Sequence, residues 1–533
     1  MSVQISYPGV YIEELPSGVH TITGVATSIA AFVGWAYQGP VDRTVLVESW
    51  SDFQSQFGGL SNYNGIPNYL GYAVNQFFAN GGSQAYIVRV AWNSTLTAAS
   101  GTPTAPETAT ASVGGLSLYA SSPGTWANAF SVVVTVGASS RFMLNVIQTS
   151  TGNVLESFAN LSILPTDPNY VVAVINADSN YVTFVNPAAP AAAITPPTAI
   201  ATGTAALATA DASPTGDGTV LVPNSDGNFE VALGADPTAT TNTYGIHLLD
   251  RIPIFNLLCV PGLTDGPTLQ DLQQYCVIER AMLLIDSAQL GTVTAYAGGP
   301  VGYGGGAFQT TNLSSGTASS NSAFYFPWVT APDPLMGNRP AQFPPCGFVA
   351  GIYAATDASR GVWKAPAGIA TGLTGVLGLQ HVLTDAEHGQ LNPYAVNCLR
   401  EFRTYGDVVW GARTTQGADT IGSQWAYVPI RRLALFIESS LYEGTQWVVF
   451  EPNDEPLWGQ VRLNVGSFMQ GLFLQGAFQG SSPKQAYFVK CDSENNPQSS
   501  IDQGIVNILV GFAPLYPAEF VVIQIQQIAL GSS

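Results

Sequence analysis

Three acidic or imidazole side chains close together in the sequence have the residue types of a metal site. His381, Asp385 and His388 lie within the segment HVLTDAEH, and imidazole and carboxylate groups are common ligands of Zn²⁺. The segment offers no second pair of ligands, so a solvated loop or a helix end explains the same residues. We therefore predict no metal site here.

Two further features have the pattern of catalytic or phosphate-binding groups. Asp286 follows a buried apolar run, where α/β enzymes often place catalytic residues, but the sequence puts no base or nucleophile beside it. The glycine-rich run at residues 302–306 follows no convincing strand and opens no helix, so a flexible loop is its simplest interpretation. No GxSxG, HExxH or GxxxxGK[ST] motif occurs. We predict a protein without catalytic residues or cofactors.

Composition indicates a chain that hides much of its surface in subunit contacts. Only 10% of the 533 residues are charged, against about 25% in typical soluble proteins. The net charge of −19 disfavours general binding to nucleic acid, because the phosphate backbone would repel it. Five cysteines stand singly, without CxxC spacing, and we expect them to be buried, reduced thiols: Cys259, Cys276, Cys346, Cys398 and Cys491.

The start of the chain lacks the basic stretch and apolar core of a signal peptide, and no apolar run reaches the ~18 residues of a membrane-spanning helix. We therefore expect synthesis in the cytoplasm and no direct insertion into a membrane. An outer-membrane barrel would need a signal peptide and regular strands of about ten residues.

The elements that must position these groups alternate between strands and helices. Apolar runs predict strands at residues 27–36, 44–48, 86–90, 253–260, 281–285 and 487–490. Helical spacing predicts a helix that begins with a capping box at Ser51 and ends at Gly58, and further helices around 70–80, 269–276 and 457–472. This alternation is typical of an α/β unit with a parallel sheet.

A long segment near residues 95–243 interrupts that pattern. It is rich in Ala, Thr, Ser, Pro and Gly, with strand groups near 130–147 and 170–185 and a nearly low-complexity run at 187–215. We predict an inserted, mostly β domain, part of which could instead be a linker. The fold class is thus mixed α/β (α+β), with an α/β core and a β insertion.

Both ends of the chain read as strands that have no hairpin partner beside them. Alternating apolar residues predict an N-terminal and a C-terminal arm: Val3, Ile5, Tyr7, Val10, Tyr11 and Ile12, and then Phe520, Val522, Ile523 and Ile525. Such strands can complete the open sheet edge of another subunit. Ordinary edge strands within one domain explain the pattern equally well.

Long motifs in the C-terminal half resemble the tail sheath proteins of contractile phage tails and of phage-tail-like contractile injection systems. They include FVAGIYAATDASRGVWKAPAG from Phe348, LNPYAVNCLREFRTYGDVVWGART from Leu391 and YVPIRRLALFIESSLYEGTQWVVFEPNDEPLW from Tyr427. The N-terminal stretches PGVYIEELPSG from Pro8 and FFANGGSQAYIVRV from Phe77 resemble the same family in the same order. The middle segment does not match.

The resemblance implies a structural, energy-storing subunit. In this family, subunits stack as hexameric rings around an inner tube and contract to drive the tube through a target envelope, and their terminal arms add strands to neighbouring subunits. The implied partners are further copies of the chain, the inner tube protein, and baseplate and tail terminator proteins.

The implied domains are an N-terminal arm at 1–20, a core at 21–95 and 245–390, the inserted outer domain at 96–244, a tube-facing C-terminal domain at 391–515 and a C-terminal arm at 516–533. Three arginines could face the tube, although pairing inside the domain explains them equally well: Arg431, Arg432 and Arg462. The alternative function is that of a secreted or surface β-rich adhesin or hydrolase, which would require an export route.

Overall fold

The computed structural model describes residues 20–91, 107–137, 141–187, 189–210, 221–224, 227–239, 243–297, 313 and 316–524. The chain forms two compact units. The larger comprises Ala26–Arg431, and the smaller combines the chain before residue 26 with the chain from Arg432 onward. None of the helices in the described ranges is both long and apolar enough to span a bilayer.

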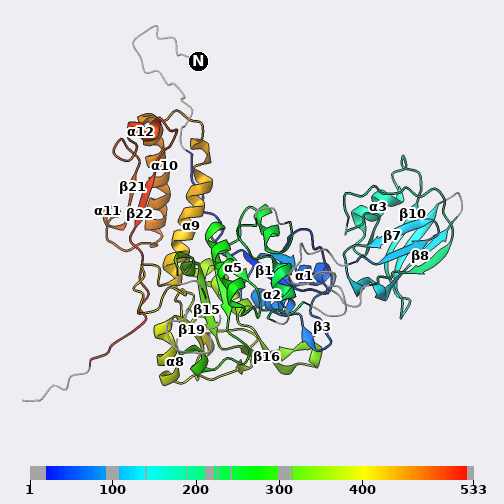
Figure 1. Cartoon of the computed structure of the whole chain (residues 1–533), viewed down its shortest axis with the longest axis horizontal. Helices are drawn as coiled ribbons and strands as arrows, with labels where there is room; N and C mark the ends of the chain where they lie inside the picture. The colour runs from blue at the N-terminus through cyan, green and yellow to red at the C-terminus, as the bar shows by residue number, and fades with distance from the viewer. Residues whose placement is uncertain are drawn as a thin grey trace, which may run out of the picture. The chain divides into compact units, whose positions relative to one another are not determined.

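An eight-stranded, mostly parallel sheet organises the larger unit (Figure 1). Parallel pairing joins, in spatial order, β5 (Ala85–Arg89), β1 (Ala30–Gly34), β13 (Leu257–Cys259), β14 (Met282–Asp286), β15 (Ser322–Phe326) and β19 (Val396–Phe402). Antiparallel strands close the two edges: β2 (Val45–Val47) beside β5, and β20 (Gly406–Val409) beside β19. The strands β1, β13, β14 and β15 are buried along their whole length, as in sheets covered on both faces.

Helices cover both faces of this sheet and divide its apolar side chains into two cores. Along β1, Ala31 and Val33 belong to the core that includes α5 (Gly266–Ile278), whereas Ala30 and Phe32 belong to the core with α2 (Tyr69–Ala79) and α7 (Cys346–Arg360). The two-residue period of a strand produces this division. Helices α2 and α7 pack so closely that a Cβ atom at Gly347 would lie 2.4 Å from the Ala73 carbonyl oxygen.

Shorter elements complete the larger unit. They are α1 (Trp50–Phe57), α4 (Asn228–Leu233), α6 (Val293–Tyr296), α8 (Asp385–Leu391), the hairpin β3–β4 (Asn62–Tyr63, Ile66–Pro67), and the sheet β17–β16–β18 (Arg339–Phe343, Val329–Asp333, Gly378–Leu379). The predicted helix end at Gly58 is confirmed. The N-cap of α1 is Ser49, whose side chain accepts from the Asp52 N–H, and not the predicted Ser51. The serine two residues earlier is the one with the extended backbone that an N-cap requires.

The inserted segment forms two antiparallel sheets around a core of its own. One sheet has the order β10–β9–β8–β12 (Val154–Leu161, Phe142–Gln148, Phe130–Val136, Gly203–Ala206), and the other β11–β7–β6 (Val182–Thr183, Leu116–Ala120, Thr110–Val113). This core ends at Leu207, whereas Leu221, Phe229 and Leu233 contribute to the core of the large sheet. The structure thus differs from the predicted boundary at residue 244.

A helix replaces part of the second strand group expected in the insertion. The prediction of strands over 170–185 is wrong for α3 (Val171–Asp178) and holds only for the short β11. Val171, Val172 and Ile175 are buried together at helical spacing. Packing of that face therefore overrides the β-branched residues' preference for strands.

The smaller unit pairs two long helices with a two-stranded sheet. Helix α9 (Val428–Gly444) enters it from the larger unit, and α10 (Glu455–Leu474) lies alongside β21 (Tyr487–Lys490) and β22 (Leu509–Phe512) (Figure 1). The short helices α11 (Pro483–Ala486) and α12 (Gln498–Ile501) flank the strands. The predicted C-terminal domain began at residue 391, but β19 is hydrogen-bonded to β15, and the chain up to Arg431 belongs with the large sheet.

Candidate assembly surface

His381 and Asp385, which have the residue types of metal ligands, lie at a helix cap and in an ion pair. Thr384 and Glu387 make a reciprocal capping box at the start of α8. Glu387 also lies 3.2 Å from His381 Nε2, and Asp385 accepts from Arg400 Nη1 at 2.8 Å. No cluster of three metal-ligating side chains occurs among the described residues.

Asp286 links three segments of the larger unit: the end of β14, the loop after β13 and the start of α7. Its carboxylate accepts from the Gly262 N–H at 3.0 Å and from the Cys346 N–H at 2.7 Å, so it caps the first turn of α7, where Pro345 has no side-chain acceptor. Complete burial raises the pKa of Asp286 to about 6, although these N–H groups oppose the shift. The contacts assign it a structural role at the end of β14.

The remaining candidates for chemistry add no reactive group. All five cysteines are free and buried. Burial raises the pKa of the Cys276 thiol well above its ordinary value, which disfavours the nucleophilic thiolate. The glycine run at 302–306 lies outside the described residues.

The two-stranded sheet of the smaller unit has strand edges that no further strand covers among the described residues. Tyr487 to Lys490 pair antiparallel with Phe512 to Leu509, and no further strand joins either edge among the described residues. An isolated two-stranded sheet is marginally stable in water, and open edges template pairing with other chains. The sheet is therefore a site where further strands can add.

One face of this sheet presents apolar side chains to solvent. Phe488 is 53% exposed and Leu509 is 52% exposed, and a Cβ atom at Gly511 would lie 2.2 Å from the Phe488 ring. The aromatic ring thus covers the glycine across the strand pair. The opposite face packs on α10, where the Tyr487 hydroxyl donates to Gln470 at 2.9 Å.

The C-terminal arm leaves the last strand as an extended and exposed apolar run. Phe520, Val521, Val522 and Ile523 are 74–81% exposed and belong to no strand. Four consecutive exposed apolar residues are costly in water unless another surface covers them. The remaining predicted arm residues lie outside the described part of the chain: Val3, Ile5, Tyr7, Val10, Tyr11, Ile12 and Ile525.

The three arginines predicted to face a tube differ in their surroundings. Arg431 donates to Asn321 Oδ1 at 2.9 Å and lies 5.0 Å over the Trp425 ring, and Arg432 is only 3% exposed. Arg462 is partly exposed, pairs with Glu455 at 2.5 Å and also donates to the Cys491 carbonyl. The Arg462 side chain is 35% exposed, so its charge lies closer to solvent than that of Arg432.

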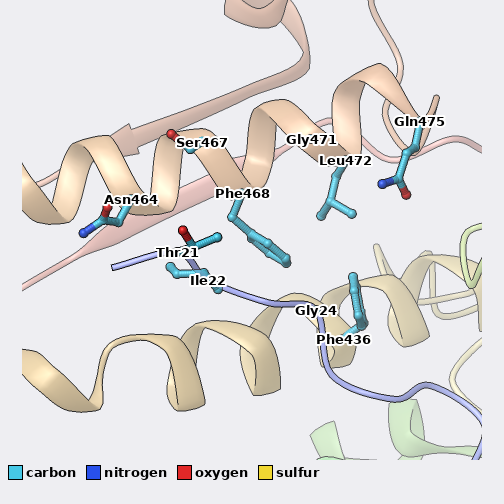
Figure 2. A pocket seen from close by; sticks show the side chains of 10 residues that line it. All are labelled: Thr21, Ile22, Gly24, Phe436, Asn464, Ser467, Phe468, Gly471, Leu472 and Gln475. Carbon is cyan, nitrogen blue, oxygen red and sulfur yellow. The ribbon is translucent and has the colours of Figure 1, made fainter. Parts of the chain in front are cut away.

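A pocket opens between α9, α10 and the chain before residue 26. It has a volume of about 310 Å³, and its lining residues are Thr21, Ile22, Gly24, Phe436, Asn464, Ser467, Phe468, Gly471, Leu472 and Gln475. Figure 2 shows Phe468 and Leu472 pointing from α10, and Phe436 from α9, toward the same space. The sequence analysis interpreted the apolar residues of α10 as core, and for that reason it did not predict this pocket. It also did not predict the strand β22.

Residues 420–528 match the family of the phage tail sheath C-terminal domain. The chain is 28% identical over 169 residues to a tail sheath protein of Vibrio phage KVP40, covering 31% of this chain and 24% of that protein. It is 27% identical over 184 residues to a putative prophage major tail sheath protein of Pseudomonas aeruginosa, covering 34% of this chain and 45% of that one. These alignments thus span less than half of either relative.

The fold extends the likeness to the whole chain. A subunit of the PVC sheath complex, an extracellular contractile injection system solved in its contracted state, aligns with 99% of this chain and 99% of its own, at 21% identity and a TM-score of 0.55. The C-terminal domain match and the two sheath relatives agree with this likeness of fold. Residues 420–528 are thus similar to the phage tail sheath C-terminal domain, and the chain as a whole has the fold of a subunit from a contractile sheath.

Proposed function

We propose that this chain is the repeating structural subunit of a contractile sheath. Subunits polymerise as stacked hexameric rings around an inner tube, and contraction of the stack drives the tube through a target envelope. The observation that carries the proposal is the incomplete sheet β21–β22 together with the exposed apolar arm at 520–523. Among the described residues, this sheet has only two strands, and the arm pairs with no strand.

Exchange of arms suits a machine whose subunits must rotate without separating. Each backbone hydrogen bond of an added strand contributes about 0.5–1.5 kcal/mol net, so a strand of several residues holds firmly. The strands fix the edge of the sheet but not the orientation of the larger unit. The arms can therefore keep a mesh connected while the rings shorten and widen.

The partners follow from this role. They are further copies of the chain, the inner tube protein, and the baseplate and tail terminator proteins at the two ends of the sheath. Assembly takes place in the cytoplasm, and the product is part of a phage tail or of a phage-tail-like particle. No observation in the structure favours the alternative function of an adhesin or hydrolase over this one.

Truncation of the arms tests the proposal. Deletion of the residues before Glu13, or of those after Pro517, removes one intersubunit strand and spares both cores. We expect folded protein that no longer forms cylinders in negative-stain micrographs, while the full chain forms them. Proline at Ile523 should act similarly, because it removes a hydrogen-bond donor from the ladder. Normal cylinders from either truncated protein would refute the exchange of arms.

A further inference from the structure

Two carboxylates face each other across the hairpin formed by β19 and β20. Antiparallel pairing sets Glu401 opposite Asp407, one residue pair before the end of the hairpin. The Asp407 carbonyl accepts from the Leu373 N–H at 2.9 Å, and so points away from β19. Glu401 and Asp407 are therefore a non-hydrogen-bonded pair, whose Cα atoms lie about 4.5 Å apart and whose side chains come closest. We call these two side chains the carboxyl pair.

The carboxyl pair lies partly out of contact with water. Glu401 is exposed, but Asp407 is half-buried, and its Oδ1 atom is buried with no hydrogen-bond partner among the described residues. Like charges directly opposite each other destabilise a strand pair, and burial disfavours an ionised carboxylate. Both effects act against the doubly charged form of the carboxyl pair and favour a form that has bound one proton.

The basic side chains of the hairpin do not neutralise the carboxyl pair. Arg400 projects from the other face of β19, because successive side chains of a strand alternate, and it donates to Asp385 at 2.8 Å. Arg403 stands in the turn beside the titratable Tyr405, and it forms no ion pair within the described part of the chain. The hairpin itself therefore supplies no counter-charge.

The elements packed against the hairpin have few charges on the side of β20. Residues 368–373, which bond to the outer edge of β20, contain no titratable side chain. The charged and titratable groups at the end of α7, on α8 and between them are Asp357, Arg360, Lys364, His381, Asp385, Glu387 and His388. Of all these groups and those of the hairpin, Glu401 is the one whose charge shifts the pKa of Asp407.

Burial raises the pKa of the Asp407 carboxyl above its ordinary value, and the charge of Glu401 raises it further. The folded chain thus keeps a proton at Asp407 over a pH range in which the unfolded chain has lost it. The resulting stabilisation is fully present below about pH 4, near the ordinary pKa of an aspartate, and is lost as the pH rises through the folded value.

We propose that Glu401 and Asp407 share one proton in acid and hold β19 to β20 more firmly there than at neutral pH. In the protonated pair the Asp407 hydroxyl donates to the Glu401 carboxylate, and a hydrogen bond to an ionised acceptor is short and strong. At neutral pH the same two groups repel each other. This device belongs to the single subunit, so it goes beyond the proposed function and does not rest on it.

The carboxyl pair lies where it affects one edge of the eight-stranded sheet. β20 is the last strand at that edge. Its outer side bonds to residues 368–373, where the Gly368 N–H donates to the Val409 carbonyl at 2.9 Å and the Leu373 N–H donates to the Asp407 carbonyl. Separation of β20 from β19 near the turn disturbs these bonds as well. Amides of both segments should therefore exchange faster as the pH rises.

Hydrogen exchange of the full chain, measured by mass spectrometry between pH 4.5 and 7.5, tests the proposal. Corrected for intrinsic exchange, protection of peptides from residues 399–409 in the wild type should fall about two- to fivefold relative to Asp407→Asn as the pH rises. The variant cannot ionise at this position, and its NH₂ group can donate to Glu401 at every pH. At pH 7.5 it should therefore be protected more strongly than the wild type.

Two further variants separate the carboxyl pair from a general effect of charge removal. Glu401→Gln should also raise protection at pH 7.5, and the double variant with Asp407→Asn should gain no more than the better single variant, because the two groups act as one unit. Asp385→Asn removes a carboxylate that is paired with Arg400, so its protection at pH 7.5 should equal that of the wild type or be lower.

Three results would overturn the proposal. One is a difference between Asp407→Asn and the wild type that stays constant from pH 4.5 to 7.5. Another is an equal gain of protection from Asp385→Asn. The third is a loss of wild-type protection at pH 7.5 on addition of EDTA, because a bound divalent cation would then hold the carboxylates together. Exchange is measured on the subunit whether or not it forms cylinders, so failure here leaves the sheath proposal untouched.

Discussion

The buried carboxylate of Asp286 should make the stability of the larger unit depend on pH. Burial raises its pKa from 3.8 to about 6 in the folded chain. The folded state thus keeps the proton over a pH range where the unfolded state has lost it. Stabilisation from this group is fully present below pH ~4 and is lost as the pH rises through ~6.

The size of the effect follows from the shift. A difference of about two pKa units corresponds to ~3 kcal/mol at 1.36 kcal/mol per unit. Asp286→Asn cannot ionise, but its NH₂ group faces one of the two N–H donors, which leaves a buried donor unpaired at a cost of about 1–3 kcal/mol. The variant should be less stable than wild type near pH 4.5 and closer to it, or more stable, near pH 7.5.

Hydrogen exchange measured by mass spectrometry can follow this difference locally. We expect the opening free energy of peptides around Gly262 and Cys346, corrected for intrinsic exchange, to change between the two pH values by about 2 kcal/mol more in wild type than in the variant, because part of the ~3 kcal/mol is already lost at pH 4.5. Peptides from β9, in the separate core of the insertion, provide the internal control. A wild-type-minus-variant difference that stays constant from pH 4.5 to 7.5 would refute the reasoning.

Three further predictions concern the insertion, its attachment and the tube contact. Arg89 is 1% exposed and donates to three backbone carbonyls, so Arg89→Leu should lower the unfolding free energy by roughly 3 kcal/mol, measured by urea denaturation, and Arg89→Lys by less. Replacement of Thr95–Thr219 by a Gly/Ser linker should leave cylinders intact in micrographs, because that segment has its own core; their loss with a folded remainder would contradict this. Arg462→Glu should weaken co-sedimentation with the inner tube and flatten its salt dependence, whereas the exposed Arg360→Glu should not; equal behaviour of the two would exclude the contact.

The sequence by itself determined the elements whose apolar pattern is strong. Local composition predicted the buried strands β1, β13 and β14, because a strand covered on both faces must be apolar throughout. It also predicted the end of α1 at Gly58, because glycine adopts the left-handed conformation of a C-cap at little cost. The short apolar run of β21 was recognised as a strand as well. The resemblance to tail sheath proteins also followed from the sequence, since several long motifs occur in one order.

Only the tertiary structure decided which contacts those residues make. Helix α3 forms where β-branched residues suggested a strand, because burial of one face outweighs local preference. The Asp286 carboxylate accepts hydrogen bonds from Gly262 and Cys346, which lie far apart in the sequence. His381 contacts Glu387, a residue of the capping box of α8. The full exposure of the Phe450 side chain and the burial of the Asn464 carboxamide have no local signal, since exposure and hydrogen-bond satisfaction are properties of the folded chain.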